Sequence, residues 1–135
     1  EEPRARRISN AIVRKRPLRS TGELAKVIEE ALGRRGRIHP ATRTFQAIRI
    51  EVNQEMRTLE TGLAAAIEVL KPGGKLVVIS YHSLEDREVK VTMRDSPVLR
   101  VITKKPIPTS QEEVRVNPRS RSARMRVSER LDGGL

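Results

Sequence analysis

The 135-residue sequence contains no cysteine, no tryptophan, a single tyrosine and a single phenylalanine. Without cysteine there is no thiol nucleophile, no disulfide framework and no Cys-ligated zinc. The two histidines, His39 and His82, are far apart and lack metal-ligand spacing. We therefore expect no metal site. Because aromatic side chains are so few, stacking platforms for single-stranded nucleic acid are excluded as well.

Long apolar runs are also missing. None approaches the ~20 residues that a membrane-spanning helix needs, so we expect no membrane partner. The lack of cysteine is compatible with a cytoplasmic protein. The chain opens on Glu1-Glu2-Pro3 without an initiator methionine. We expect it to have been trimmed or cut from something longer.

Acidic residues are in short supply. There are 28 Lys and Arg against 17 Asp and Glu, which gives a formal net charge of +11. Such an excess favours a polyanionic partner, and nucleic acid is the usual one. With few aromatics, recognition has to depend on Arg and Lys, on backbone amides and on shape. The length is enough for one domain with a modest core.

The N-terminal third predicts two helices. Residues 3–15 form a short basic helix with one apolar face. Ser20 and Glu23 then have the spacing of a capping box, and Gly33 is a suitable stop for the second helix. Residues 33–38 form a basic loop that contains two glycines.

A third, long helix is expected from Pro40 to Leu70. Apolar residues follow at steps of three or four, which predicts one stripe along its whole length. The members of this stripe are Phe45, Ile48, Val52, Met56, Leu59, Leu63, Ile67 and Leu70.

The last part of the chain predicts strands. The apolar run 76–79 is continuous, which is typical of a strand buried on both faces in a parallel sheet. A helix over 84–94, a strand over 98–103 and an irregular link over 104–118 follow. Residues 122–128 alternate, so we expect an edge or antiparallel strand. Its buried face is expected to carry Ala123, Met125 and Val127, and its solvent face Arg124 and Arg126.

His82 and Ser83 follow the apolar strand directly. In open α/β sheets, ligands lie outside the carboxyl ends of the strands, so these two are candidate catalytic residues. The alternative is structural. Ser83 would be a helix N-cap with Asp86 completing the box, and His82 would pack at the turn.

Two groups of polar residues are candidates for binding RNA. Residues three or four apart on the long helix make one ridge: Arg43, Gln46, Arg49 and Asn53. The alternative for this ridge is a solvated face with ordinary ion pairs. Arginines spaced by small residues near the C-terminus suit a phosphate track: Arg119, Arg121, Arg124 and Arg126. The alternative for them is an edge strand blunted by charge.

The glycines do not form a cofactor loop. A nucleotide-cofactor loop needs glycines after a strand and before a helix. Gly73 and Gly74 instead come before the strand, where they predict a turn. We therefore expect no cofactor-binding residue in this chain.

Three stretches resemble one family. HPATRTFQAIRI, GGKLVVISYHSLEDREVK and NPRSRSARMRVSE are similar to the C-terminal half of the bacterial 16S ribosomal RNA (cytosine-N4)-methyltransferases, of the RsmH or MraW type. The segment RRISNAIVRKRPLRSTGELAKVI resembles the end of that family's inserted helical domain. The resemblance covers nearly the whole chain, although Tyr81 stands where family members usually have phenylalanine.

The resemblance implies a fold, a reaction and partners. The fold is α/β, the C-terminal part of a class I, Rossmann-like methyltransferase with part of an inserted helical domain. Residues 1–38 would end the substrate-recognition insert, and 39–135 would be the C-terminal half of the methyltransferase domain. The reaction is methyl transfer from S-adenosylmethionine to N4 of a cytidine in 16S rRNA of the small ribosomal subunit. The cofactor would be held by residues upstream of this chain, so the fragment alone would be inactive.

Two other interpretations stay open. The chain could be a non-catalytic, basic RNA-binding module derived from this fold. It could also be a structural fragment whose exposed apolar edge is covered by another chain or, as a homodimer, by a swapped copy of itself.

Overall fold

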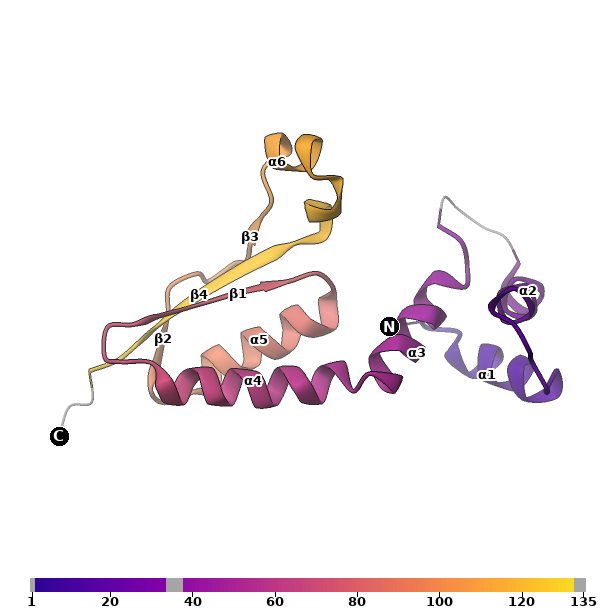
Figure 1. Ribbon diagram of the computed structural model, residues 1–135, viewed down its shortest axis with the longest axis horizontal. Coiled ribbons are helices and arrows are strands. Elements are labelled where there is room, and N and C mark those ends of the chain that lie inside the picture. Colours follow the sequence, from indigo (N-terminus) through magenta and orange to yellow (C-terminus); the bar gives the residue numbers. More distant parts are fainter. Residues whose placement is uncertain (1, 34–37, 133–135) are drawn as a thin grey trace. The chain divides into compact units, whose positions relative to one another are not determined.

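The structure of the chain is a computed structural model that describes residues 2–33 and 38–132 (Figure 1). Most of the predicted basic loop at 33–38 therefore lies outside the described residues. The chain divides into two compact units, Glu1–Glu55 and Met56–Leu135. The predicted domain boundary, between residues 38 and 39, differs from this division.

The N-terminal unit consists of helices. They are α1 (Ala5–Arg14), α2 (Thr21–Leu32) and α3 (Thr42–Val52). Ile8 of α1 and Ile28 of α2 are buried at the centre of a small apolar core. The predicted start of α2 is confirmed, because the Ser20 hydroxyl accepts a hydrogen bond of 3.1 Å from the Glu23 amide.

The prediction of one helix from Pro40 to Leu70 is wrong. Helix α3 ends at Val52, and α4 (Glu55–Val69) begins after a break at Gln54, whose φ is +51°. The apolar stripe is divided by this break. Phe45 packs on the N-terminal core, whereas Leu63 belongs to the core of the other unit.

The C-terminal unit is a small sheet with helices. After most of α4 come β1 (Lys75–Ser80), α5 (Ser83–Asp95), β2 (Leu99–Val101) and β3 (Ile107–Pro108). The chain continues as α6 (Gln111–Val116), a 3-10 helix η1 (Pro118–Ser122) and β4 (Arg124–Arg130). The strand order is β1-β4-β2, and β3 pairs with the start of β4. Every pairing is antiparallel to β4, so β1 and β2 run parallel to each other without touching.

Helices α4 and α5 lie on the same side of this sheet (Figure 1). The core between them contains Leu63 of α4, Leu76 of β1, Val89 and Met93 of α5, and Leu99 of β2. The opposite face of β1 is open, with Val77 53% and Ile79 55% exposed. The prediction that β1 is buried on both faces is therefore wrong for the described residues.

Strand β4 faces the opposite way from the prediction. Because Val78 pairs with Arg126, these two residues lie on the helix-covered face of the sheet. Arg126 is only 6% exposed and Ser128 is fully buried. Met125 and Val127 lie on the other face, next to Ile79 and Val77.

The glycine turn is confirmed. The Gly73 amide donates to the Arg130 carbonyl at 2.9 Å, and the Arg130 amide donates to the Gly74 carbonyl at 2.8 Å. Gly73 has a φ of +74°, and a Cβ at Gly74 would lie 2.7 Å from the Lys71 carbonyl oxygen. The turn therefore requires glycine and connects α4 to β1 beside the end of β4.

Within the described part of the chain, every helix is too short or too polar to cross a bilayer.

Candidate functional site at the tip of β1

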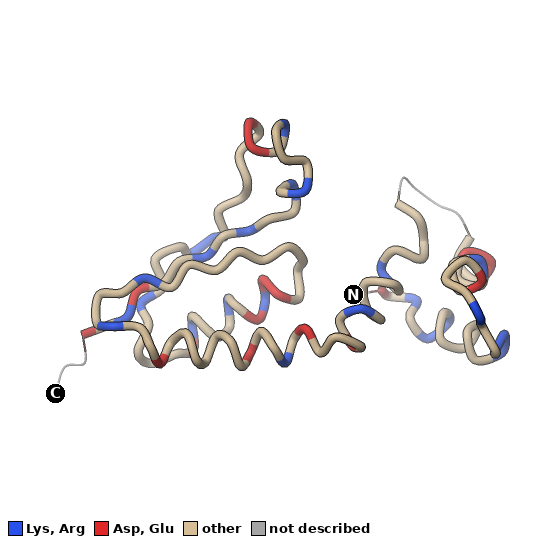
Figure 2. Tube along the Cα trace, in the orientation of Figure 1, with Lys and Arg blue, Asp and Glu red and all other residues tan. Residues whose placement is uncertain are grey.

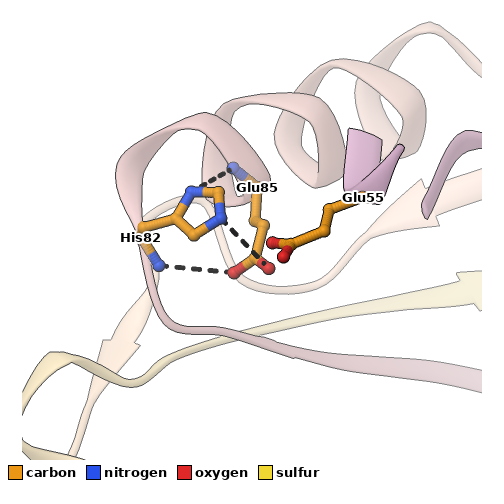
Figure 3. A group of neighbouring side chains, drawn as sticks. All are labelled: Glu55, His82 and Glu85. Atoms are coloured by element: carbon orange, nitrogen blue, oxygen red, sulfur yellow. Dashed lines mark hydrogen bonds and ion pairs between the residues drawn. The ribbon is translucent and has the colours of Figure 1, made fainter. Parts of the chain in front are cut away.

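The carboxyl end of β1 leads directly into α5. Ser80 is buried at the end of the strand, Tyr81 is 57% exposed, and His82 is the N-cap of α5. His82 Nδ1 accepts a hydrogen bond of 3.3 Å from the Glu85 amide. In return, Glu85 Oε2 accepts from the amides of Tyr81 (2.8 Å) and His82 (3.3 Å). Figure 3 shows this reciprocal arrangement of His82 and Glu85.

The cap lies one residue earlier than predicted. His82 and Glu85 form the capping box, in place of Ser83 and Asp86. Ser83 is the first residue of α5 and is exposed. Sequence reasoning missed Glu85, although its position three residues after His82 is the spacing of a capping box with histidine as the cap.

The cap orients the imidazole of His82. Because Nδ1 accepts a hydrogen bond, the neutral ring carries its proton on Nε2. Nε2 is buried, has no hydrogen-bond partner among the described residues, and lies 3.2 Å from Oε1 of Glu85. The cap therefore fixes the orientation of one imidazole beside one carboxylate at the end of the strand.

Asp86 has a different partner from the one predicted. Its carboxylate accepts two hydrogen bonds from the guanidinium of Arg126, at 2.7 Å and 2.9 Å. The Arg126 side chain is 7% exposed and the Asp86 side chain 22%. This two-point ion pair joins the first turn of α5 to the middle of β4. It occupies the fork of the Arg126 guanidinium, so the predicted solvent-facing position of Arg126 is wrong.

The other C-terminal arginines remain accessible. Arg119 and Arg121 are exposed on η1. Arg124 is half-buried, and its Nη1 donates to the Ala123 carbonyl at 2.9 Å. The backbone of η1 is held in place because the Thr109 hydroxyl donates to the Ser120 carbonyl at 2.6 Å. The predicted track thus consists of two arginines on η1 and one at the start of β4, without Arg126.

A hollow of about 310 Å³ lies on the open face of the sheet beside this track. Ile79, Ile107 and Met125 give it an apolar lining. Glu113 and Asn117 add polar groups, and the Asn117 side-chain amide donates to Glu113 Oε1 at 3.2 Å. The hollow therefore combines an apolar surface with a few polar atoms at one end.

The ridge on α3 is largely engaged in contacts within its own unit. Arg49 donates to both oxygens of Glu55, at 2.8 Å and 3.2 Å, and Asn53 donates to the same carboxylate at 3.2 Å. Arg49 is therefore in an ion pair, as the alternative interpretation of this ridge predicts. Gln46 is half-buried.

Arg43 lies 3.5 Å from the carboxylate of Glu2. Hydrogen bonds from the backbone and side chain of Arg4 hold the pKa of the Glu2 carboxyl below its ordinary value, and Arg43 adds a smaller Coulombic contribution. Glu2 thus remains a carboxylate beside Arg43 at neutral pH.

Comparison with known proteins decides the family. The model of the MraW methylase family matches residues 1–131. The chain belongs to the MraW methylase family. The predicted resemblance and the predicted fold class, the C-terminal part of such a methyltransferase, are thereby confirmed. The mixed helix and sheet architecture of the C-terminal unit is consistent with a fragment of a methyltransferase of the MraW family.

Curated relatives of this MraW-family chain carry the name ribosomal RNA small subunit methyltransferase H. The protein of Nostoc punctiforme is 54% identical over 134 residues, which cover 97% of this chain and 45% of the relative. The protein of Acaryochloris marina is 55% identical over 135 residues, and that of Dehalococcoides mccartyi 53% over 150 residues. The chain spans about 45% of the length of the relatives that it matches.

Gly73 and Gly74 form a turn in which their backbone amides are engaged. The backbone amides of Gly73 and Gly74 donate to the carbonyls of Arg130 and Lys71, so neither is available to a ligand. The described part of this MraW-family chain offers no glycine-rich loop between a strand and a helix.

Proposed function

We propose that the protein to which this chain belongs methylates N4 of a cytidine in 16S rRNA of the small ribosomal subunit. The observation that carries the proposal is the match to the MraW methylase family over residues 1–131. The name of the relatives, ribosomal RNA small subunit methyltransferase H, supports the choice of substrate. S-adenosylmethionine would supply the methyl group, bound by residues outside this chain.

The chain contributes the nucleoside side of the site. The N4 lone pair of cytosine is delocalised into the ring, so transfer needs an aligned approach and an acceptor for the amine proton. His82 and Ser83 are proposed to line the nucleoside side as catalytic residues, because they follow the carboxyl end of β1. The capping box fixes the ring of His82 by its Nδ1 and leaves Nε2 as the ring atom that faces a carboxylate.

The RNA-contacting residues are proposed from their accessibility. Arg119, Arg121 and Arg124 stay on the phosphate track, whereas Arg126 holds α5 on β4 and is no longer included. On α3, Arg43 and Gln46 remain proposed contacts. Arg49 and Asn53 can join them only by releasing the carboxylate of Glu55.

The direct test is methyl transfer by the full-length protein. Small subunits isolated without this modification would be incubated with protein and S-adenosylmethionine labelled in the methyl group. We expect label in N4-methylcytidine after complete digestion of the 16S rRNA. Label in another nucleoside would contradict the proposed substrate.

The rival function has its own signature. A non-catalytic RNA-binding module would retain 16S rRNA on a filter but would neither bind S-adenosylmethionine nor transfer label. Equilibrium dialysis of the full-length protein against the labelled cofactor therefore separates the two interpretations.

A further inference from the structure

The seam between α1 and α2 contains a continuous basic groove. One hollow of about 360 Å³ is lined by Arg7, Arg14 and Lys15 of α1 and its C-cap, and by residues of α2. A second, of about 550 Å³, continues past Arg19 and Lys26. The two share Lys15, Val27 and Glu30, so they form one groove.

The groove is positively charged on balance. Five cationic side chains line it, against the two carboxylates of Glu23 and Glu30. Both carboxylates already have contacts within the unit. Glu23 Oε2 accepts from the Arg19 amide at 2.7 Å, and Glu30 lies 4.0 Å from the Lys15 ammonium. Glu30 therefore offsets one lining cation, Lys15, and the lining as a whole keeps an excess of positive charge.

Arg7 and Arg14 have no carboxylate partner among the residues that the structure describes. Both are exposed, and with Ala11 they lie on the face of α1 that lines the groove, next to the buried Ile8. Figure 2 shows Lys and Arg along α1 and its connection to α2. Packing of α1 on α2 thus places two guanidinium groups on one wall of the groove. Neither has a carboxylate partner among the described residues.

We propose that this groove binds the phosphate backbone of the RNA substrate, independently of base sequence. Guanidinium groups match phosphate geometry with two parallel hydrogen bonds, and several cations along one groove suit the repeated charges of a nucleic-acid backbone. The groove wall also includes Ala11, Val27 and Ala31, none of which can read a base by hydrogen bonding. The inference rests on the proposed function for the identity of the RNA. Binding of phosphates in the groove is inferred from the groove residues themselves.

The chain offers a matched control within the same segment. Arg6 lies in the first turn of α1 and Arg16 follows its C-cap; both are exposed and neither lines the groove. The variants Arg7→Ala/Arg14→Ala and Arg6→Ala/Arg16→Ala therefore remove the same charge from the same region. A difference in RNA affinity between the two variants would show that the groove binds RNA, since an effect of net charge alone would be equal in both.

Filter binding of the full-length protein to a 16S rRNA fragment, over a range of salt concentrations, measures the effect. We expect Arg7→Ala/Arg14→Ala to weaken binding by roughly tenfold or more per arginine. The slope of log K against log salt should fall by about 1.4 to 1.8. The control should keep most of its affinity and slope. A uridine homopolymer of the same length should show the same losses, because phosphates are read rather than bases.

Equal behaviour of the two variants, or an unchanged salt slope in both, would overturn the proposal. That result would leave the groove to another partner, such as an acidic protein. Circular dichroism spectra that differ between the two variants would show that α1 is damaged. Charge-conserving Arg7→Lys/Arg14→Lys would then take the place of the alanine variant, with a smaller loss of affinity and an unchanged slope expected.

The proposed methyl transfer is measured separately. If the wild-type protein binds RNA with the expected salt slope but transfers no label, the proposed methyl transfer is contradicted and the proposed RNA binding by the groove is retained. If transfer occurs and the groove variant raises neither KM nor the RNA dissociation constant, the groove fails and the function stands.

Discussion

At the residue scale, the ion pair between Asp86 and Arg126 is the contact with the largest expected effect on stability. Removing one partner leaves the other charge buried without compensation. We expect Arg126→Met to lower the free energy of unfolding by about 2–4 kcal/mol, because Asp86 retains some access to solvent. Urea unfolding of the full-length protein measures this loss.

Arg124→Met is the natural control, because Arg124 lies two residues away on the same strand and its side chain donates to a neighbouring carbonyl. It should change the free energy of unfolding by less than about 1 kcal/mol. In Asp86→Leu/Arg126→Met, the loss should be smaller than the sum of the two single losses. Equal losses in Arg126→Met and Arg124→Met would show that the pair contributes little.

A second prediction concerns two glycines whose replacement by alanine should change stability in opposite directions. Gly74→Ala would place a Cβ 2.7 Å from the Lys71 carbonyl oxygen, and backbone atoms cannot give way cheaply. Gly62 lies inside α4, where an added Cβ would meet nothing within 4 Å, so Gly62→Ala removes only backbone freedom of the unfolded chain. We expect Gly74→Ala to destabilise by roughly 1–3 kcal/mol and Gly62→Ala to stabilise by about 0.5–1 kcal/mol. Thermal unfolding of both variants checks the two signs, and a Gly74→Ala variant as stable as wild type would contradict the turn geometry.

At the scale of elements, the cap of α5 has two proposed tasks that substitution can separate. His82→Ala removes the ring that accepts from the Glu85 amide, which should cost about 1 kcal/mol. Asparagine is a good N-cap, so His82→Asn should recover that stability. If the imidazole takes part in proton transfer, methyl transfer by His82→Asn should still fall by roughly 100-fold or more, the usual size of an acid–base contribution.

The measurement is kcat with saturating RNA, beside the unfolding midpoint of each variant. Recovery of both stability and kcat in His82→Asn would restrict His82 to the structural task. Ser83→Ala is a useful companion, because Ser83 is not the cap of α5.

The elements also show which parts of the fold could be predicted from sequence. Ser20 with Glu23, the pair Gly73-Gly74 and the apolar run before Ser80 are local signals, and each element they predict is present. The break at Gln54 has no such signal, because no glycine or proline marks it. Across the break, Arg49 and Asn53 donate to the carboxylate of Glu55, and the spacing of apolar residues carries no trace of these contacts.

The facing of β4 was unpredictable for a related reason. Alternation shows that Met125 and Arg126 lie on opposite faces, but the choice of buried face depends on the partner across the sheet. Asp86, forty positions earlier, supplies the charge that makes burial of Arg126 favourable. The position of His82 at the end of β1 could therefore be predicted from local pattern, whereas the contacts of Asp86 and Arg126 needed the three-dimensional pairing.

At the scale of the whole molecule, the open face of the sheet is the dominant feature. Val77 and Ile79 are more than half exposed on β1, which also pairs on one side only within the described residues. Exposed apolar surface beside an unpaired strand edge is a template for association. We therefore expect this chain, expressed by itself, to self-associate, with a light-scattering mass well above 15.3 kDa.

Charge on the open face should reverse this association. Val77→Lys/Ile79→Lys adds two like charges to the surface where copies would meet, so the mass should fall toward that of one chain. Val69→Lys is the control, because Val69 is 81% exposed on α4 and belongs to no strand. A monomeric wild-type chain would contradict the prediction. So would association that both variants reduce equally, since the open face would then have no special part in it.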